Sequence, residues 1–193
     1  MAQPNLKNRI VYSEQTTALV RLTEAELEGD YPNWFSDAEV NQFNSHWAFP
    51  KSKSEVASFV HNLANDRRQL VFAIYDLVSN RHIGNISLQA IDWQNRNGEL
   101  AFLLGDKSQW GKGHGQRAGA LVIQHGFQVL NLHRLYLGCL SNNLAMQRLA
   151  EKLGFKAEGV RKQAVFNQNQ YVDVCEYGLL KADAHENAAT GGS

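Results

Sequence analysis

Three glycines at alternate positions, Gly111, Gly113 and Gly115, form the part of the sequence best suited to bind a ligand. An apolar run at residues 99–104 precedes them, and a helix-like run at residues 118–130 follows them. Glycine lets main-chain N–H groups turn toward an anion without obstruction by a side chain, and the first turn of a helix adds a favourable dipole. This order of strand, glycine-rich turn and helix predicts a site for a pyrophosphate-containing cofactor.

Two common phosphate-binding motifs do not fit this stretch. The sequence contains no Walker-type loop, Gly-x-x-x-x-Gly-Lys-Ser/Thr. The dinucleotide pattern Gly-x-Gly-x-x-Gly fits Gly113 and Gly115 but meets Ala118 at its third position. The stretch also lies in mid-chain rather than after a first strand, which disfavours a Rossmann fold. A flexible surface turn is the remaining alternative, but such a turn does not require three alternating glycines.

The hydrophobic pattern predicts alternating strands and helices around this stretch. Thr23 and Glu26 have the spacing of a capping box, Ser52 or Ser54 can cap a second helix, and Gly154 can end the last one. The predicted helices cover residues 24–35 (broken by Pro32), residues from 52 or 54 to 67, residues 118–130 and residues 142–153. The predicted strands cover residues 9–12, 17–22, 70–78, 81–91, 98–104, 134–140, 155–160 and 171–180. We expect one domain over residues 1–182 and a disordered tail over residues 183–193.

Three segments resemble the GNAT superfamily of N-acetyltransferases. Residues 110–115 resemble the family's Arg/Gln-x-x-Gly-x-Gly/Ala loop, with Trp110 where many members have Arg or Gln. Residues 142–155 resemble its Asn-x-x-Ser/Ala…Leu-Gly-Phe helix and turn, and residues 171–180 resemble the last strand of the branch that acetylates N-terminal alanine or serine of ribosomal proteins. The resemblance covers about residues 16–181. It implies an α/β (α+β) fold, with a mixed, mostly antiparallel central sheet of about seven strands flanked by about four helices.

The resemblance implies acetyl-CoA as the co-substrate. Main-chain amides of the loop would cradle its diphosphate, and Lys112 and Arg117 would help to neutralise the phosphates unless they are ordinary solvated side chains. Asn143 would contact the pantetheine arm or cap its helix. Backbone groups of Leu103 and Leu104 would hold that arm and the thioester carbonyl if their strand diverges from its neighbour. The expected cofactor contacts are Leu103, Leu104, Trp110, Gly111, Lys112, Gly113, His114, Gly115, Gln116, Arg117 and Asn143.

Acetyl transfer to an amine requires a proton acceptor, because an alkylamine with a pKa of about 10 is mostly protonated at neutral pH. Glu99 begins the strand that leads into the loop, a position where family members often have a general-base glutamate. A solvated strand-end carboxylate is the alternative interpretation. Ala150 stands where many members have the tyrosine that protonates the leaving thiolate. This leaves the acid unassigned, with Ser141 and Tyr177 as minor candidates.

An aromatic cluster around His46, within residues 31–49, lies where relatives build the acceptor pocket. Core packing is one explanation of the cluster. The other is a planar floor for a sugar, a base or a peptide end, with His46 as a polar contact or a second base. We expect a small-molecule acceptor such as an amino sugar or a nucleotide-linked amino sugar, with a protein N-terminus as the alternative. A non-catalytic acyl-CoA-binding module is a further alternative, because the tyrosine is missing at position 150.

The composition disfavours several other classes of protein. Among 193 residues, 19 basic and 19 acidic side chains give a net charge of zero, which argues against bulk electrostatic binding to nucleic acid. The sequence has no membrane-length apolar run, no apolar signal core and no metal-binding spacing of His or Cys. Cys139 and Cys175 lie in apolar runs, so we expect reduced thiols. A cytoplasmic monomer or homodimer is expected, without a metal, membrane or nucleic-acid partner.

Overall fold

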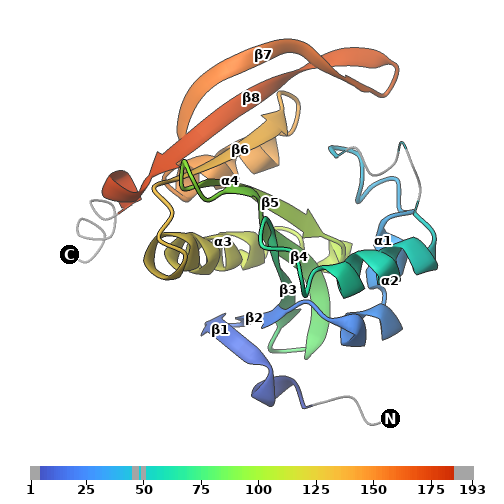
Figure 1. Cartoon of the computed structure of the whole chain (residues 1–193). Coiled ribbons are helices and arrows are strands. Elements are labelled where there is room, and N and C mark those ends of the chain that lie inside the picture. The colour runs from blue at the N-terminus through green and yellow to red at the C-terminus, as the bar shows by residue number, and fades with distance from the viewer. Residues whose placement is uncertain (1–4, 45–47, 49–50, 185–193) are drawn as a thin grey trace.

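A single mixed sheet of eight strands, in the order β1-β2-β3-β4-β5-β6-β8-β7, forms the centre of the computed structural model (Figure 1). The structure describes residues 5–44, 48 and 51–184. Strands β1 to β5 form an antiparallel meander, β6 runs parallel to β5, and β8 and β7 complete the sheet in antiparallel pairing. The bounds are β1 (Ile10–Glu14), β2 (Thr17–Arg21), β3 (Leu70–Asp76), β4 (Arg81–Asp92), β5 (Asn97–Leu104), β6 (Arg134–Leu140), β7 (Lys156–Asn167) and β8 (Gln170–Leu180).

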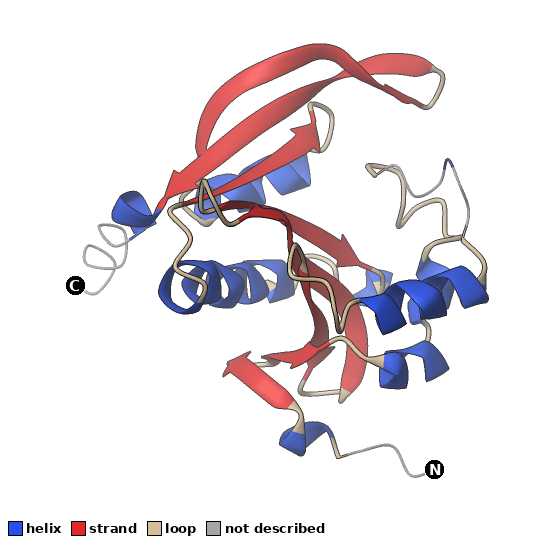
Figure 2. Ribbon diagram, in the orientation of Figure 1, coloured by secondary structure: helices blue, strands red, loops and turns tan. Residues whose placement is uncertain are grey.

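Helices pack against both faces of this sheet (Figure 2). On one face, α3 and α4 bury Ala118, Val122 and Ala150 against the apolar side chains of β4, β5 and β6. On the other face, α1 and α2 form a smaller core with β3 and with Leu103 of β5. The helical elements are η1 (Leu6–Asn8), η2 (Glu24–Glu28), α1 (Tyr31–Trp34), α2 (Lys53–Asn62), η4 (Lys107–Gln109), α3 (His114–Gln124), η5 (His125–Val129) and α4 (Leu144–Lys152).

Local sequence signals explain most of the helix ends. Ser52 begins α2 with a capping box that it completes with Glu55. Asn143 begins α4, and its Oδ1 accepts a hydrogen bond from the main-chain N–H of Met146 at 3.1 Å. Gly154 follows α4 with φ +86°, the left-handed conformation that stops a helix. The end of α4 is therefore where the sequence predicted it.

The largest differences from the sequence prediction occur where tertiary packing overrides local pattern. The helix expected over residues 24–35 is two short pieces, because Gly29 is extended between η2 and α1. The helix expected from residue 118 begins at His114, directly after the left-handed Gly113, and ends in the π-helical turn η5. The strand expected over residues 155–160 continues to Asn167 and forms a long hairpin with β8. The sheet has eight strands rather than about seven.

This hairpin, β7–β8, extends beyond the rest of the sheet and is mostly exposed along β7 (Figure 1). Asn167 connects it to the segment after α1, because its Nδ2 donates to the carbonyl oxygen of Gln42 at 3.1 Å. Residues 181–184 form a helical turn, so the tail predicted as disordered from residue 183 begins in regular structure, and residues 185–193 lie outside the described part. None of the helices within the described residues is both long and apolar enough to cross a membrane.

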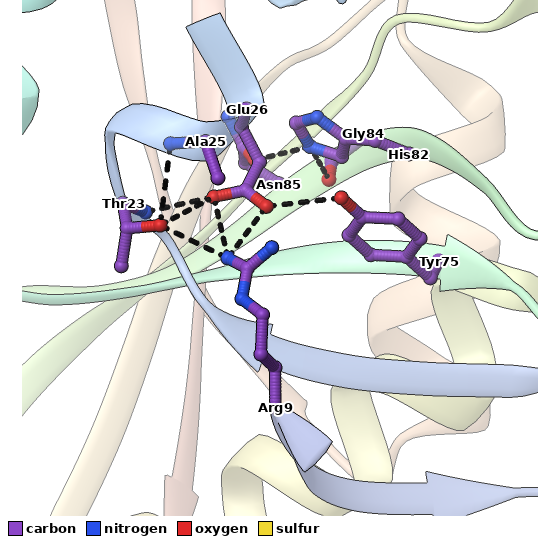
Figure 3. A network of polar contacts seen from close by, with 8 residues as sticks. All are labelled: Arg9, Thr23, Ala25, Glu26, Tyr75, His82, Gly84 and Asn85. Atoms are coloured by element: carbon purple, nitrogen blue, oxygen red, sulfur yellow. Dashed lines mark hydrogen bonds and ion pairs between the residues drawn. The ribbon is translucent and has the colours of Figure 1, made fainter. Parts of the chain in front are cut away.

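The buried carboxylate of Glu26 joins the N-terminal segment to strand β3 (Figure 3). The side chain of Glu26 has no exposed surface, and its Oε1 accepts from Arg9 at 2.7 Å and from the Tyr75 hydroxyl at 2.9 Å. The main-chain N–H of Thr23 donates to its Oε2 at 2.9 Å, as the capping-box spacing predicted. The His82 ring stacks on Tyr75, which extends this network to strand β4. A charge this deeply buried is tolerated because each oxygen has a donor.

Candidate active site

Strands β5 and β6 separate shortly after they begin to pair. Their parallel register covers only three positions, the last of which pairs Glu99 with Tyr136, although β5 continues to Leu104 and β6 to Leu140. Beyond this point the facing edges of the two strands do not pair with each other, so main-chain groups become available to a ligand. The divergence expected near Leu103 and Leu104 is therefore present, and it starts at Glu99.

A cavity of about 520 Å³ lies at this opening, between the end of β5, the glycine loop and α4. A volume of this size is typical of small-molecule and cofactor sites. Of the predicted cofactor contacts, those that line the cavity are Leu103, Leu104, Trp110, Gly111, Gly113, Gly115, Gln116 and Asn143. The fold thus brings eight of the eleven together from three separate parts of the chain.

The loop has the backbone conformation that an anion cradle requires. Gly111 and Gly113 have φ +75° and +82°, a region that favours glycine, and a side chain at Gly111 would meet no atom within 4 Å. The first turn of α3 leaves the N–H groups of residues 114–116 without acceptors inside the helix. The indole N–H of Trp110 donates to the carbonyl oxygen of Leu104 at 2.9 Å and holds the loop against β5. This geometry fits a diphosphate.

Two predicted phosphate contacts have their side chains elsewhere. His114 is buried, and its Nδ1 shares a hydrogen bond of 2.9 Å with the hydroxyl of Thr17. The Arg117 guanidinium donates from Nε to Thr17 at 2.8 Å and from Nη2 to the carbonyl oxygen of Lys112 at 2.9 Å. Burial, with a smaller contribution from Arg117, lowers the pKa of His114. These side chains fasten the loop to β2 instead of lining the cofactor cavity.

The cations that line the cofactor cavity instead come from α4. Arg148 and Lys152 stand one helical turn apart on that helix and both line the cavity, whereas Lys112 is exposed and outside it. Sequence reasoning missed this pair, although its i,i+4 spacing after Asn143 was a usable signal. Asn143 itself lines the cavity while its Oδ1 caps α4, so the two predicted roles are compatible.

A second cavity, of about 530 Å³, lies on the other face of β5, against α1, α2 and the hairpin. The side chains of Glu99, Ala101 and Leu103 alternate toward it, and their partners across the β4–β5 register are Gln89, Ser87 and Asn85. The floor of this cavity therefore carries a row of polar side chains, Gln89, Ser87 and Asn85, beside the Glu99 carboxylate. We call these three residues the β4 ladder. Sequence reasoning did not identify this ladder, because its members alternate with core residues on one ordinary-looking strand.

Glu99 is the only titratable carboxylate among the residues that line both cavities in the described part of the chain. It is half-buried, and the side-chain amide of Gln89 donates to its Oε2 at 3.0 Å. Tyr136 faces it across the strand register, and the pKa of Tyr136 is raised by burial and then by the charge of Glu99. A carboxylate at the point where the two cavities meet can accept a proton from a group that enters from either side.

The remaining predicted catalytic residues are placed differently. His46 lies outside the described residues. Tyr177 is buried in the main core and Ser141 lies beyond the end of β6, and neither lines either of these two cavities. Their positions give no support to a role as the acid. Ala150 is fully buried in the same core, so α4 presents no hydroxyl from that position.

The aromatic cluster divides between core and pocket. Tyr31, Trp34 and Phe35 belong to the smaller core, and the indole of Trp34 packs so closely on Gly105 that an added Cβ would lie 1.9 Å from it. Tyr31 and Phe35 also line the acceptor-side cavity, together with Phe43. Core packing of the cluster is therefore confirmed for Trp34, whereas Tyr31 and Phe35 belong to the core and also line this cavity, so a role for them in binding an acceptor stays a prediction.

Comparison with known proteins agrees with this geometry. The family model of the acetyltransferase (GNAT) domain matches residues 17–156, most of the chain. The chain belongs to the GNAT acetyltransferases. As a member of this family it is an acetyl-CoA-dependent N-acetyltransferase, and the predicted fold class is confirmed.

Relatives of this GNAT acetyltransferase align along nearly their whole length. The N-acetyltransferase p20 of Bacillus licheniformis is 26% identical over 90% of this chain and 97% of its own. The probable N-acetyltransferase YjcK of Bacillus subtilis is 27% identical over 92% and 98%. Among solved structures, the fold is similar to that of spermidine N-acetyltransferase from Vibrio cholerae in complex with CoA and spermine, with a TM-score of 0.80, 22% identity, and coverage of 89% of this chain and 99% of that one.

A second solved structure gives the same fold. RimL, a ribosomal L7/L12 alpha-N-protein acetyltransferase in complex with coenzyme A, superposes with a TM-score of 0.81 at 21% identity, covering 91% of this chain and 99% of its own. At this level of identity the likeness establishes the fold, and the acceptor has to be argued from the site itself.

Proposed function

We propose that this GNAT acetyltransferase acetylates a primary amine on a small, ring-bearing molecule, such as an amino sugar or a nucleotide-linked amino sugar. The observation that carries the proposal is the position of Glu99 between the cofactor cavity and the cavity on the other face of β5. In this proposal acetyl-CoA occupies the first cavity and supplies the activated acetyl group, and the acceptor occupies the second.

Glu99 acts as the general base in this proposal. An amine arrives largely as an ammonium ion and must lose a proton before it can act as a nucleophile. The carboxylate of Glu99 accepts that proton directly or through a water molecule, and the Gln89 amide, 3.0 Å from its Oε2, keeps it pointed along the cavity floor. The reaction is direct transfer in a ternary complex rather than through an acetylated cysteine. Burial raises the pKa of Cys139 to about 11, so this cavity-lining thiol is a poor nucleophile at neutral pH.

The preference for a ring-bearing polyol rests on the floor and walls of the acceptor cavity. Asn85, Ser87 and Gln89 lie at every second position of β4. Asn85 Oδ1 is hydrogen-bonded to His82 and Gln89 Nε2 to Glu99, and the Ser87 hydroxyl and the remaining amide groups can bind hydroxyl groups of an acceptor. Tyr31, Phe35 and Phe43 provide aromatic surface on which the apolar face of a sugar or a base can lie.

The proposal is tested by following release of free thiol from acetyl-CoA with a panel of amines: amino sugars, nucleotide-linked amino sugars, peptides with free N-termini, and polyamines. We expect turnover with amino sugars that Glu99→Gln lowers strongly at neutral pH. Turnover only with peptides would support the alternative, an acetyltransferase for protein N-termini, which the shared fold with RimL makes worth testing. Binding of acetyl-CoA without turnover on any amine would favour the second alternative, a non-catalytic acyl-CoA-binding module.

A further inference from the structure

Two cationic side chains line the acceptor cavity from its walls, and the proposed chemistry does not use either. Lys51 lies just before α2, and its Nζ is 5.7 Å from the ring centroid of Phe35 and 5.7 Å from that of Phe59. Arg161 lies on β7, in the hairpin. Lys51 and Arg161 are 110 positions apart in sequence and meet at one cavity only through the fold.

Both cations keep N–H donors that no carboxylate uses. Lys51 makes no ion pair with a carboxylate among the described residues, although its charge helps to lower the pKa of Glu55, and it lies over two aromatic faces. Arg161 donates from Nε to Glu176 Oε1 at 2.5 Å, a contact that uses one of the five N–H groups of a guanidinium. Glu176 does not itself line the cavity.

The charged side chains that line the cavity are therefore one carboxylate and two cations, with Glu176 beside the cavity as the ion-pair partner of Arg161. Among the described residues that line it, Glu99 is the one acid, and Lys51 and Arg161 are the bases. An acceptor with one ammonium group can place it at Glu99. Further ammonium groups, as in a polyamine, would lie beside cations and meet repulsion, whereas a negatively charged group would be attracted and could be bound by the guanidinium.

We propose that the acceptor carries an anionic group, a phosphate or a carboxylate, in addition to its amine. Lys51 and Arg161 bind the anion, and the amine lies at Glu99. This inference rests on the proposed function and narrows it to anionic ring-bearing amines, which separates this protein from acetyltransferases of polyamines.

Matched pairs of acceptors test the inference. Glucosamine 6-phosphate and glucosamine differ by the phosphate, and phenylalanine and phenylalaninamide differ by the carboxylate, so the two pairs also distinguish which anion is bound. A charge-assisted contact of about 1.5–3 kcal/mol corresponds to roughly 10- to 100-fold in kcat/KM. We expect the anionic member of at least one pair to exceed its neutral partner by at least about 10-fold, an advantage that decreases with added salt. Equal values in both pairs, or a higher value with spermidine, would overturn the inference.

Substitutions of Lys51 and Arg161 test whether these two side chains cause the preference for an anionic acceptor. Lys51→Gln and Arg161→Gln should each lower kcat/KM for the anionic acceptor by about 10-fold and leave the neutral one nearly unchanged. Because Arg161→Gln also frees Glu176, the pair Arg161→Gln with Glu176→Gln removes the cation without leaving a bare carboxylate. Lys53→Gln on α2 and Lys162→Gln on β7 make the same charge change at exposed neighbours that do not line the cavity, and they should have no effect.

A failure of the proposed function gives a different result from a failure of this inference. If no amine is acetylated, calorimetry of glucosamine 6-phosphate against the CoA-bound protein still tests the anion site. Binding that Lys51→Gln and Arg161→Gln both weaken would support it, and binding that neither variant changes, or no binding at all, would overturn it.

Discussion

The two cavities on either side of β5 are built in opposite ways. The phosphate cradle of the cofactor side is local in sequence, because β5, the glycine loop and the first turn of α3 follow one another without a break, although α4 and residues 39–44 also line that cavity. The acceptor side collects α1, α2, β4, β5 and the β7–β8 hairpin, whose residues span most of the chain. The first can be recognised from a short motif, and the second exists only when distant segments pack together.

Their chemical character differs in the same way. Main-chain N–H groups dominate the cofactor side, where glycines keep side chains out of the cradle. Side chains dominate the acceptor side, where Glu99, the β4 ladder and two cations set the polarity. Substitutions in the glycine loop should therefore change cofactor affinity, and substitutions in the acceptor cavity should change selectivity and turnover.

The largest effect is expected for Gly113→Glu. The position has φ +82°, an added Cβ would lie 2.8 Å from Arg117 Nη1, and a carboxylate would repel the diphosphate. We expect a roughly 1,000-fold loss of CoA affinity, about 4 kcal/mol, by calorimetry. Gly159→Ala on β7 is the matched control, since a Cβ there meets no atom within 4 Å. Unchanged affinity in Gly113→Glu would remove the loop from the cofactor site.

Glu99→Gln should lower kcat by about 100-fold at pH 7 and leave CoA affinity unchanged, the pattern expected for loss of a general base. The difference from the wild type should shrink as the pH rises, because a larger fraction of the amine is then already neutral. Steady-state rates between pH 6.5 and 9 measure this. Glu14→Gln, at an exposed position of β1, serves as the control. A pH-independent deficit would assign Glu99 to binding rather than proton transfer.

A weaker effect, on stability rather than chemistry, is expected for Arg9→Met. It leaves the Glu26 carboxylate, which has no exposed surface, without its cation. The free energy of unfolding should decrease by about 2 kcal/mol in urea denaturation. The double variant with Glu26→Gln should recover part of this loss, because the charge is gone and the single amide oxygen still accepts from one of the two donors, Tyr75 or Thr23. If the single and double variants have the same free energy of unfolding, the loss does not come from the uncompensated charge.

The smallest expected effect is a decrease in stability at low pH, and it does not distinguish the cofactor cavity from the acceptor cavity. Burial lowers the pKa of His82 on β4, of His114 at the start of α3, and of His125 after α3. The unfolded chain therefore binds protons at these sites at a higher pH than the folded protein, and stability should fall as the pH decreases below about 6.5. Urea denaturation at pH 7.5 and 5.5 measures the slope, which His125→Gln should reduce. Carboxylates whose pKa is lowered in the folded protein, such as Asp76 and Glu158, change the stability only at lower pH.

Sequence reasoning succeeded where the determining contacts are close in the chain. The capping box at Thr23, one of the two predicted caps of the second helix (Ser52), the glycine stop at Gly154 and the strand Arg134–Leu140 are in place as predicted. It failed where packing decides the outcome. The extended Gly29 divides the first predicted helix, and β7 continues past residue 160 because β8, the next strand, pairs with it as far as Asn167.

The same division applies to the site. Glycine spacing alone indicated a phosphate cradle, because backbone conformation depends mainly on the residues at each position. The direction of a long side chain depends on its surroundings, so His114 and Arg117 were expected at the phosphates and are instead bonded to Thr17. Arg148 and Lys152 line the cofactor cavity in their place.

The sequence by itself determined the family, the cofactor loop and the candidate base, since each is encoded in a short run of residues. Only the tertiary structure decided that Glu99 lies between two cavities and that Lys51 and Arg161 line one of them. The reason is physical: main-chain geometry follows from local residue types, but a cavity and its charge arise from segments brought together by burial of a common core.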